Sequence, residues 1–293
     1  MEKIEELSKK IVNYSLEINK DDKVLITYQS QLCNDLVIGI IKEIKNIGAV
    51  VNTKLIDPVI NKELMLTTNE KRAELMGNYS KFEVEHYTAF VQIRYALNDY
   101  EDSDVSSELR NLISKYTRKY GEIRINERKW VLLNYPSQLD AYKAHQSIDK
   151  FKEYALDAMI TNYDDLNERM KPLKELMEKT VKVRIVGPNT DINFSIKNIP
   201  IIPCCGKSNL PDGEIFTAPI KNSVNGKITY NTPSPYNGSI FNNVSLEFKD
   251  GKIINATCDG DDKLLNEIFN TDDGSRYIGE FSLGLNPNIL YPI

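Results

Sequence analysis

The stretch K-V-L-I-T-Y at residues 23–28 decides the fold. It is a short run rich in β-branched and aliphatic residues, which predicts a buried strand. Similar runs recur at residues 49–56, 89–95 and 129–133. Segments with helical spacing lie before and between these runs, at residues 4–18, 34–45, 61–85 and 106–120. Strands that alternate with helices predict a parallel sheet covered on both faces, so we expect residues 1–180 to form an α/β domain.

Helical character continues to residue 179. Residues 147–161 and 164–179 both have helical spacing, and Pro172 lies inside the second pattern. Proline removes a helical hydrogen bond and clashes with the preceding turn, so the second helix is expected to be kinked or split there.

After residue 180 short alternating runs replace the helical pattern. Residues 181–185 and 191–196 flank a Gly-Pro-Asn turn at 187–189. Asn-Gly at 225–226 and Asp-Gly at 250–251 each lie between alternating runs and predict hairpins with primed turns. A helix at 261–270 and a strand at 276–283 follow. Residues 181–293 are therefore expected to form a mostly antiparallel, β-rich α+β domain. Four apolar residues are expected to share its core face: Leu246, Phe248, Ile253 and Ala256.

The charge pattern argues against two classes of partner. The 293-residue chain has a formal net charge of −5 and no block of basic residues, so neither nucleic acid nor an anionic membrane is an expected partner. No apolar stretch approaches the ~20 residues that a spanning helix needs. The acidic start M-E-K-I-E-E lacks the apolar core of a signal peptide, which favours a cytoplasmic protein.

Two common kinds of site are also missing from the sequence. The first strand ends in Tyr28-Gln29-Ser30, and neither G-x-G-x-x-G nor G-x-x-x-x-G-K-[ST] occurs, so nothing supports a nucleotide-binding function. The four cysteines form no C-x-x-C pair, and the adjacent Cys204 and Cys205 are poorly spaced as ligands of one metal. Reduced, mostly buried thiols are expected.

The string N-L-P-D-G-E-I-F-T-A-P-I at 209–220 contains the first candidate site residue. Pro211-Asp212-Gly213 has the composition of a tight turn, because proline presets φ, aspartate bonds its own backbone and glycine accepts positive φ. Glu214 follows directly, at the start of the next strand, where a rigid scaffold can aim a carboxylate. Turn composition alone equally allows Asp212 and Glu214 simply to solvate the turn.

Three strings resemble one known family: N-L-P-D-G-E-I-F-T-A-P at 209–219, G-S-R-Y-I-G-E-F-S-L-G-L-N-P at 274–287, and T-D-I-N-F-S-I at 190–196. The family is that of the thermophilic-type metallo-aminopeptidases, the aminopeptidase T and aminopeptidase S group of peptidase family M29. The similarity runs in order from about Leu7 to the last residues, and it is tightest around two glutamates.

The resemblance implies a two-metal site in the second domain, holding divalent zinc, cobalt or manganese. Carried over by position, Glu214 matches the first metal-binding glutamate and Glu280 the second, with Glu280 as the candidate bridge between the ions and thus the catalytic candidate. Peptides are the implied substrates, shortened from the N-terminus, and a homodimer is the implied assembly. A water held between two metal ions loses a proton near neutral pH and can attack the scissile carbonyl.

The sequence departs from the family pattern after residue 287. The family's remaining ligands, two histidines and an aspartate, lie downstream of the matching segment, so the second domain is expected to be incomplete. The two histidines of this sequence, His86 and His145, lie in the α/β part and match no ligand position. Zinc usually takes three or four protein ligands, typically with nitrogen or sulfur donors. This polypeptide alone is therefore expected to bind zinc or cobalt weakly and to have little aminopeptidase activity.

Three functions remain open from the sequence. The chain could be a metallo-aminopeptidase by descent whose further ligands come from elsewhere, as in one half of a split enzyme. It could be a non-catalytic relative that acts as a binding or assembly protein. The least supported function is a metal-free carboxylate activity that uses Asp212, Glu214 and Glu280.

Overall fold

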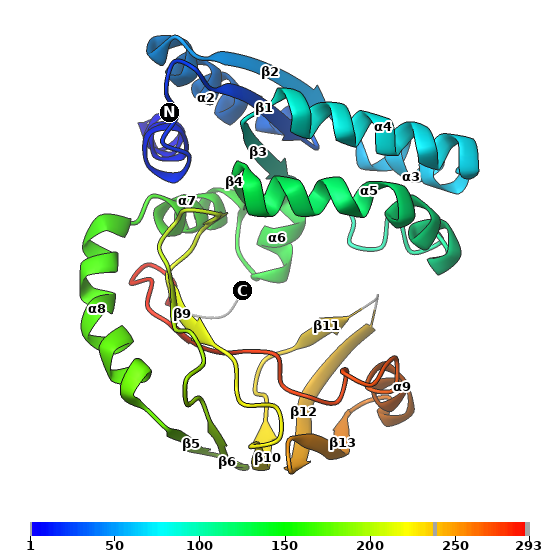
Figure 1. Ribbon diagram of the computed structural model, residues 1–293, viewed down its shortest axis with the longest axis vertical. Coiled ribbons are helices and arrows are strands. Elements are labelled where there is room, and N and C mark those ends of the chain that lie inside the picture. Colours follow the sequence, from blue (N-terminus) through cyan, green and yellow to red (C-terminus); the bar gives the residue numbers. More distant parts are fainter. Residues whose placement is uncertain (1, 237–238, 291–293) are drawn as a thin grey trace.

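The computed structural model describes residues 2–236 and 239–290. Its first sheet is parallel and five-stranded, in the order β2-β1-β3-β4-β8. Figure 1 labels β2, β1, β3 and β4 of this sheet. The four strands predicted for this half are confirmed, and a fifth joins them from the second half of the chain. The strands are β1 Lys23–Tyr28, β2 Val50–Leu55, β3 Ala89–Arg94, β4 Lys129–Asn134 and β8 Asn209–Leu210.

Helices cover both faces of this sheet because alternate strand residues point in opposite directions. Val24 and Ile26 face the larger core, which the N-terminal helices, α7 and α8 also build. Leu25 and Phe90 face the opposite side, where α4 and α5 pack. The helices of this half are α1 Glu2–Lys9, the π-helix η1 Lys10–Ser15, the 3-10 turn η2 Gln31–Cys33, α2 Asn34–Ile47, α3 Pro58–Leu66, α4 Glu70–His86, α5 Ser107–Glu127, α6 Gln138–Lys143, α7 Ile148–Met159 and α8 Tyr163–Lys179.

Three helix predictions need correction. The stretch predicted as one helix at 61–85 is two helices, because Asn69 begins α4 as its N-cap and accepts a hydrogen bond from the Arg72 backbone N–H. Helix α5 continues to Glu127, beyond the predicted end at 120, and α6 was not predicted. Helix α8 is not split at Pro172, and a kink there stays a prediction. Pro172 is exposed, so water can reach the carbonyl that loses its helical partner.

The second half of the chain builds an antiparallel sheet in the order β11-β12-β10-β6-β5, with β13 paired to β12. The four apolar residues predicted to share a face lie together in its core. The predicted helix is present as α9 Asp262–Ile268. The strands are β5 Lys182–Gly187, β6 Thr190–Ser195, β10 Asn225–Thr229, β11 Ser234–Tyr236, β12 Ser239–Lys249 and β13 Lys252–Asp259.

Of the three turns predicted between alternating runs after residue 180, two are confirmed. The Gly-Pro-Asn turn joins β5 to β6, and Asp250-Gly251, both with positive φ, joins β12 to β13. The predicted turn at Asn225-Gly226 is wrong, because Gly226 lies inside β10 and pairs with β6 and β12. A side chain there would place its Cβ 2.2 Å from the Asp191 carbonyl oxygen, so this glycine permits a close backbone approach.

A third, small sheet lies in the order β14-β9-β7. Its strands are β7 Ile202–Cys204, β9 Glu214–Thr217 and β14 Phe281–Gly284. Strand β14 is shorter than the predicted strand at 276–283 and begins after Glu280. Between β7 and β9, Asn209 and Leu210 form β8 and pair with β4 of the parallel sheet. The segment from β7 to β9 thus runs from the small sheet to the parallel sheet and back. The predicted domain boundary at residue 180 stays a prediction.

Candidate functional site

The Asp212-Gly213 turn links β8 to β9 and determines where Glu214 begins its strand. Asp212 Oδ2 accepts a hydrogen bond from the Gly206 backbone N–H at 2.6 Å, and Oδ1 accepts one from the Gly213 N–H at 2.9 Å. Burial raises the pKa of Asp212, with a further rise from the Glu214 charge, and these effects exceed the lowering by the two hydrogen bonds. Both carboxylate oxygens therefore hold the turn, which explains Asp212 as a structural residue.

The turn is also fastened to the helices of the first half. The Tyr163 hydroxyl accepts a hydrogen bond from the Asp212 N–H at 3.0 Å and donates one to the Ala158 carbonyl at 3.2 Å. Tyr163 is 1% exposed, and burial raises its pKa, so the phenol stays neutral at ordinary pH. Gly206 lies against the same ring, where a Cβ would come within 2.6 Å of a ring carbon. Residues at the α7–α8 junction thus position the start of β9.

Glu214 lies in the small sheet, and Glu280 lies just before the strand that pairs with it. Glu214 opens β9 opposite Gly284 of β14, whereas Glu280 immediately precedes β14. Four positions separate Glu280 from Gly284 (284 − 280), or about 13 Å of extended chain. The structure therefore places one predicted ligand in the small sheet and the other immediately before the paired strand, from segments far apart in sequence. Their convergence on a shared metal stays a prediction.

The two carboxylates lack cationic partners. Within residues 2–236 and 239–290, neither the Glu214 nor the Glu280 carboxylate accepts a hydrogen bond or forms an ion pair. Glu214 is half-buried and Glu280 is exposed. Arg276, the nearest arginine in sequence, instead donates to Asn270 Oδ1, Asn266 Oδ1 and the Ile253 carbonyl. Two carboxylates with free oxygens are therefore available to an external cation.

Cys204 is a neighbour of these carboxylates that the sequence interpretation missed. It lies directly opposite Glu214 in the β7–β9 pair, so both side chains leave the same face of the small sheet. Burial raises the pKa of its thiol to about 12, and the charges of Asp212, Glu214 and Glu280 add to the rise. From the sequence, Cys204 was predicted only to be a reduced, mostly buried thiol. Pairing between strands as short as β7 and β9 leaves no pattern in the sequence that would predict its position opposite Glu214.

The histidines lie apart from this sheet, as their sequence positions indicated. His86, at the end of α4, stacks on the Phe82 ring with centroids 4.0 Å apart, and its Nδ1 contacts the Phe82 carbonyl at 2.9 Å. His145 follows α6 with a φ of 54°. The described part of the chain contains no group of three or more histidine, cysteine, aspartate or glutamate side chains placed to hold a metal. The donors described here fit part of a divalent metal site and do not complete one.

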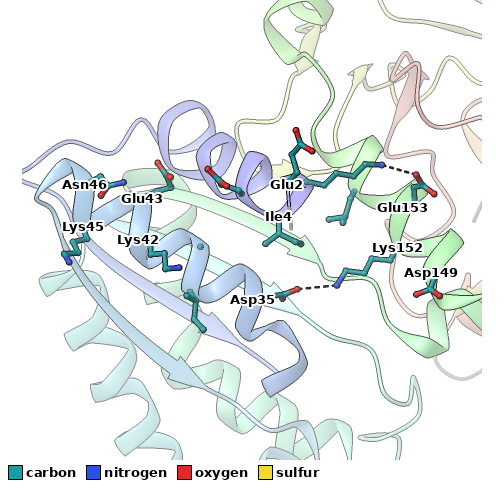
Figure 2. Close-up of a pocket in the computed structure, with 15 residues that line it drawn as sticks. Glu2, Ile4, Asp35, Lys42, Glu43, Lys45, Asn46, Asp149, Lys152 and Glu153 are labelled. Atoms are coloured by element: carbon teal, nitrogen blue, oxygen red, sulfur yellow. Dashed lines mark hydrogen bonds and ion pairs between the residues drawn. The ribbon is translucent and has the colours of Figure 1, made fainter.

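A separate groove of about 960 Å³ lies between α1, α2 and α7 (Figure 2). In Figure 2 Lys152 reaches across it toward Asp35, and their charged atoms are 3.3 Å apart. The Tyr135 hydroxyl donates to the same Asp35 oxygen at 2.6 Å. Both acidic and basic side chains line the groove. It contains none of the predicted site residues.

The comparison with family models gives the class of protein. Residues 1–291 match the model of the thermophilic metalloprotease family, M29. The match covers nearly the whole chain, so this protein belongs to the M29 family. The resemblance inferred from the strings around Glu214 and Glu280 is confirmed.

Relatives with assigned names are aminopeptidases. The chain is 37% identical over 137 residues to aminopeptidase AmpS of Bacillus subtilis, a region that covers 44% of this chain and 33% of that protein. It is 22% identical over 321 aligned positions to aminopeptidase PepS of Streptococcus thermophilus, covering 96% of this chain and 76% of that protein. A 75-residue match, 37% identical, to aminopeptidase 2 of Geobacillus stearothermophilus covers 26% of this chain and 18% of that protein. The matched regions thus span well under half of the AmpS and aminopeptidase 2 lengths.

Solved structures confirm the fold. The chain superimposes on wild-type AmpT from Thermus thermophilus with a TM-score of 0.76 and 17% identity, covering 97% of this chain and 78% of that one. It also resembles 2,5-dihydroxypyridine dioxygenase from Pseudomonas putida KT2440, with a TM-score of 0.60 and 13% identity, covering 97% and 77%. A peptidase and a dioxygenase share this architecture, so the fold by itself does not decide the reaction. Among the described residues, no helix has the length and apolar character needed to cross a membrane.

Proposed function

We propose that this protein is a metal-dependent aminopeptidase that releases N-terminal residues from peptides, with Glu214 and Glu280 as carboxylate ligands of its metal site. The observation that carries the proposal is that Glu214 opens β9, that Glu280 immediately precedes the paired strand β14, and that neither carboxylate has a cationic partner in the described part of the chain. Membership of a metalloprotease family and relatives named aminopeptidases support the reaction class.

The ions implied by the family resemblance are zinc, cobalt or manganese. A pair of such ions supplies an activated water and a Lewis acid for the scissile carbonyl. Zinc centres normally need three or four protein ligands, and the described residues supply two carboxylates without an imidazole. We therefore propose that full occupancy requires donors from outside the described residues. Without such donors, zinc or cobalt binds weakly and turnover is low.

The resemblance also supports proposals about the setting of the reaction. Peptides would be the substrates, a homodimer the assembly and the cytoplasm the compartment. The acidic net charge of −5 is consistent with a partner that is neither a nucleic acid nor an anionic membrane.

Hydrolysis of a leucyl anilide tests this function. The chain is assayed with Co²⁺, Zn²⁺ or Mn²⁺ and after chelation, together with Glu214→Gln and Glu280→Gln. Glu247→Gln is the matched control, because Glu247 is an exposed glutamate on β12. We expect slow, metal-dependent turnover that is lost in both site variants and kept in the control. Turnover that persists in chelator, or that both site variants retain, would contradict the proposal, and persistence in chelator would favour a metal-free carboxylate activity.

A further inference from the structure

Asn286 has a side-chain amide whose whole hydrogen-bonding capacity is used inside the protein. The residue is 7% exposed. Its Nδ2 donates to the Asp212 carbonyl at 2.7 Å and to the Ala158 carbonyl at 3.0 Å. Its Oδ1 accepts from Thr161 Oγ1 and from the Asn288 backbone N–H, each at 3.0 Å. An amide offers two N–H donors and two acceptor sites, so this one is fully satisfied.

The backbone around Asn286 binds the same turn as its side chain. The Leu285 and Asn286 N–H groups both donate to the Gly213 carbonyl, at 2.7 and 3.1 Å. Gly213 has a φ of 120°, and a Cβ there would lie 2.8 Å from the Asn286 Cβ. Asn286 therefore contacts the two residues that immediately precede Glu214.

The same residue lies close in sequence to the second glutamate. Asn286 follows the end of β14 by two positions (286 − 284), and Glu280 immediately precedes that strand. Through Ala158 and Thr161, the amide also ties both segments to the end of α7 and the loop after it. One side chain thus joins the turn before Glu214, the segment that carries Glu280 and the helical layer.

We propose that Asn286 is a positioning residue that fixes Glu214 and Glu280 relative to each other. The proposal rests on the proposed metal-ligand role of the two glutamates. Groups that orient metal ligands through hydrogen bonds affect metal affinity by about 10–100-fold when removed. The residue must be an amide, because both of its N–H donors point at backbone carbonyls. A carboxylate of the same shape would place oxygen against oxygen at both contacts.

Asn286→Asp therefore tests the proposal most directly, because it removes both N–H donors and keeps the shape of the side chain. Asn193→Asp is the matched control, because Asn193 is a half-buried amide on β6 that donates to the Asn225 carbonyl at 3.1 Å, away from the turn. Hydrogen exchange of the backbone amides at 212–214 and the affinity for Co²⁺ are measured on both variants and on the unmodified protein. We expect Asn286→Asp to lower protection of these amides at least tenfold and Co²⁺ affinity about 10–100-fold. Asn193→Asp should change neither quantity.

A second variant keeps the test decisive if Asn286→Asp does not fold. Thr161→Val preserves the shape of the side chain and removes the hydroxyl that donates to Asn286 Oδ1, so the same two quantities should fall by smaller factors. Protection and Co²⁺ affinity that match the Asn193→Asp control in both variants would overturn the proposal. A third outcome separates the two proposals. If the unmodified protein binds no Co²⁺ but Asn286→Asp still lowers the hydrogen-exchange protection, the contact of Asn286 with the turn is supported and the metal role of the glutamates is refuted.

Discussion

Replacing Tyr163 by phenylalanine tests whether the turn before Glu214 is held by the helices of the first half. The change removes one hydroxyl from a side chain that is 1% exposed and leaves the ring in place. The Asp212 N–H then loses its acceptor, whereas the Ala158 carbonyl keeps its hydrogen bond from Asn286 Nδ2. The part-buried Asp212 N–H is left unpaired, at about 1–3 kcal/mol, and one further hydrogen bond worth about 1 kcal/mol is lost. We expect the free energy of unfolding to fall by about 2–4 kcal/mol.

Urea unfolding followed by the fluorescence of the single tryptophan, Trp130, measures this loss. With a slope of about 3 kcal/mol per molar urea, the midpoint should move down by about 1 M. Tyr142→Phe is the control, because that side chain is 79% exposed and its substitution should change stability by less than about 0.5 kcal/mol. Equal midpoints for the two variants would refute the idea that the Tyr163 hydroxyl holds the turn.

Two further predictions concern Gly213 in the turn before Glu214 and Asp22, which immediately precedes β1. Gly213→Ala should lower the free energy of unfolding by at least about 2 kcal/mol, because φ is 120° and the new Cβ would come within 2.8 Å of a side-chain carbon. Gly121→Ala in α5 is the control: its new Cβ meets nothing within 4 Å, so this substitution should raise the free energy of unfolding by up to about 1 kcal/mol. Chemical unfolding of both variants checks this, and equal effects would contradict it. Asp22 is 6% exposed, and burial by itself would raise its pKa. Hydrogen bonds from Lys129, the Asn19 backbone N–H and Thr88 outweigh burial, so the pKa of Asp22 is lowered. Its folded-state pKa is below the unfolded value of about 3.9, so its stabilisation is present above that pH and is lost as the pH falls through the folded value. Asp22→Asn should therefore cost more stability at pH 6 than at pH 3, and a cost that is independent of pH would contradict this.

The parts of the fold predicted from sequence were those with local signals. Strand β1 and its parallel partners are runs rich in β-branched and aliphatic residues that can be recognised alone, and Asp250-Gly251 adopts the turn that its residues favour. Asn225-Gly226 is a turn-favouring pair of the same type but lies within a strand, because glycine also serves where two backbones approach closely. Strands β7 and β8 are too short to have a pattern of their own and exist through pairing with β9 and β4.

The residues of the candidate site also differ in whether a local sequence signal marks them. Glu214 follows recognisable turn residues, whereas Glu280 was found only through the family resemblance. Cys204 and Tyr163 became visible only in three dimensions, because each acts on a segment at least ten positions away in sequence. The contact of Asn286 with the turn at Asp212 likewise needed the structure. Hydrogen bonds over such separations leave no periodicity or local composition that a single sequence could display.

Calorimetric titration of the chain with Zn²⁺, alongside Glu214→Gln, Glu280→Gln and the Glu247→Gln control, tests the central claim most directly. We expect weak binding, with a Kd above about 1 μM, because two carboxylates without an imidazole hold zinc loosely. Either site substitution should abolish this binding, and the control should preserve it. Tight stoichiometric binding that survives Glu214→Gln and Glu280→Gln would contradict the assignment of these two residues as the metal ligands.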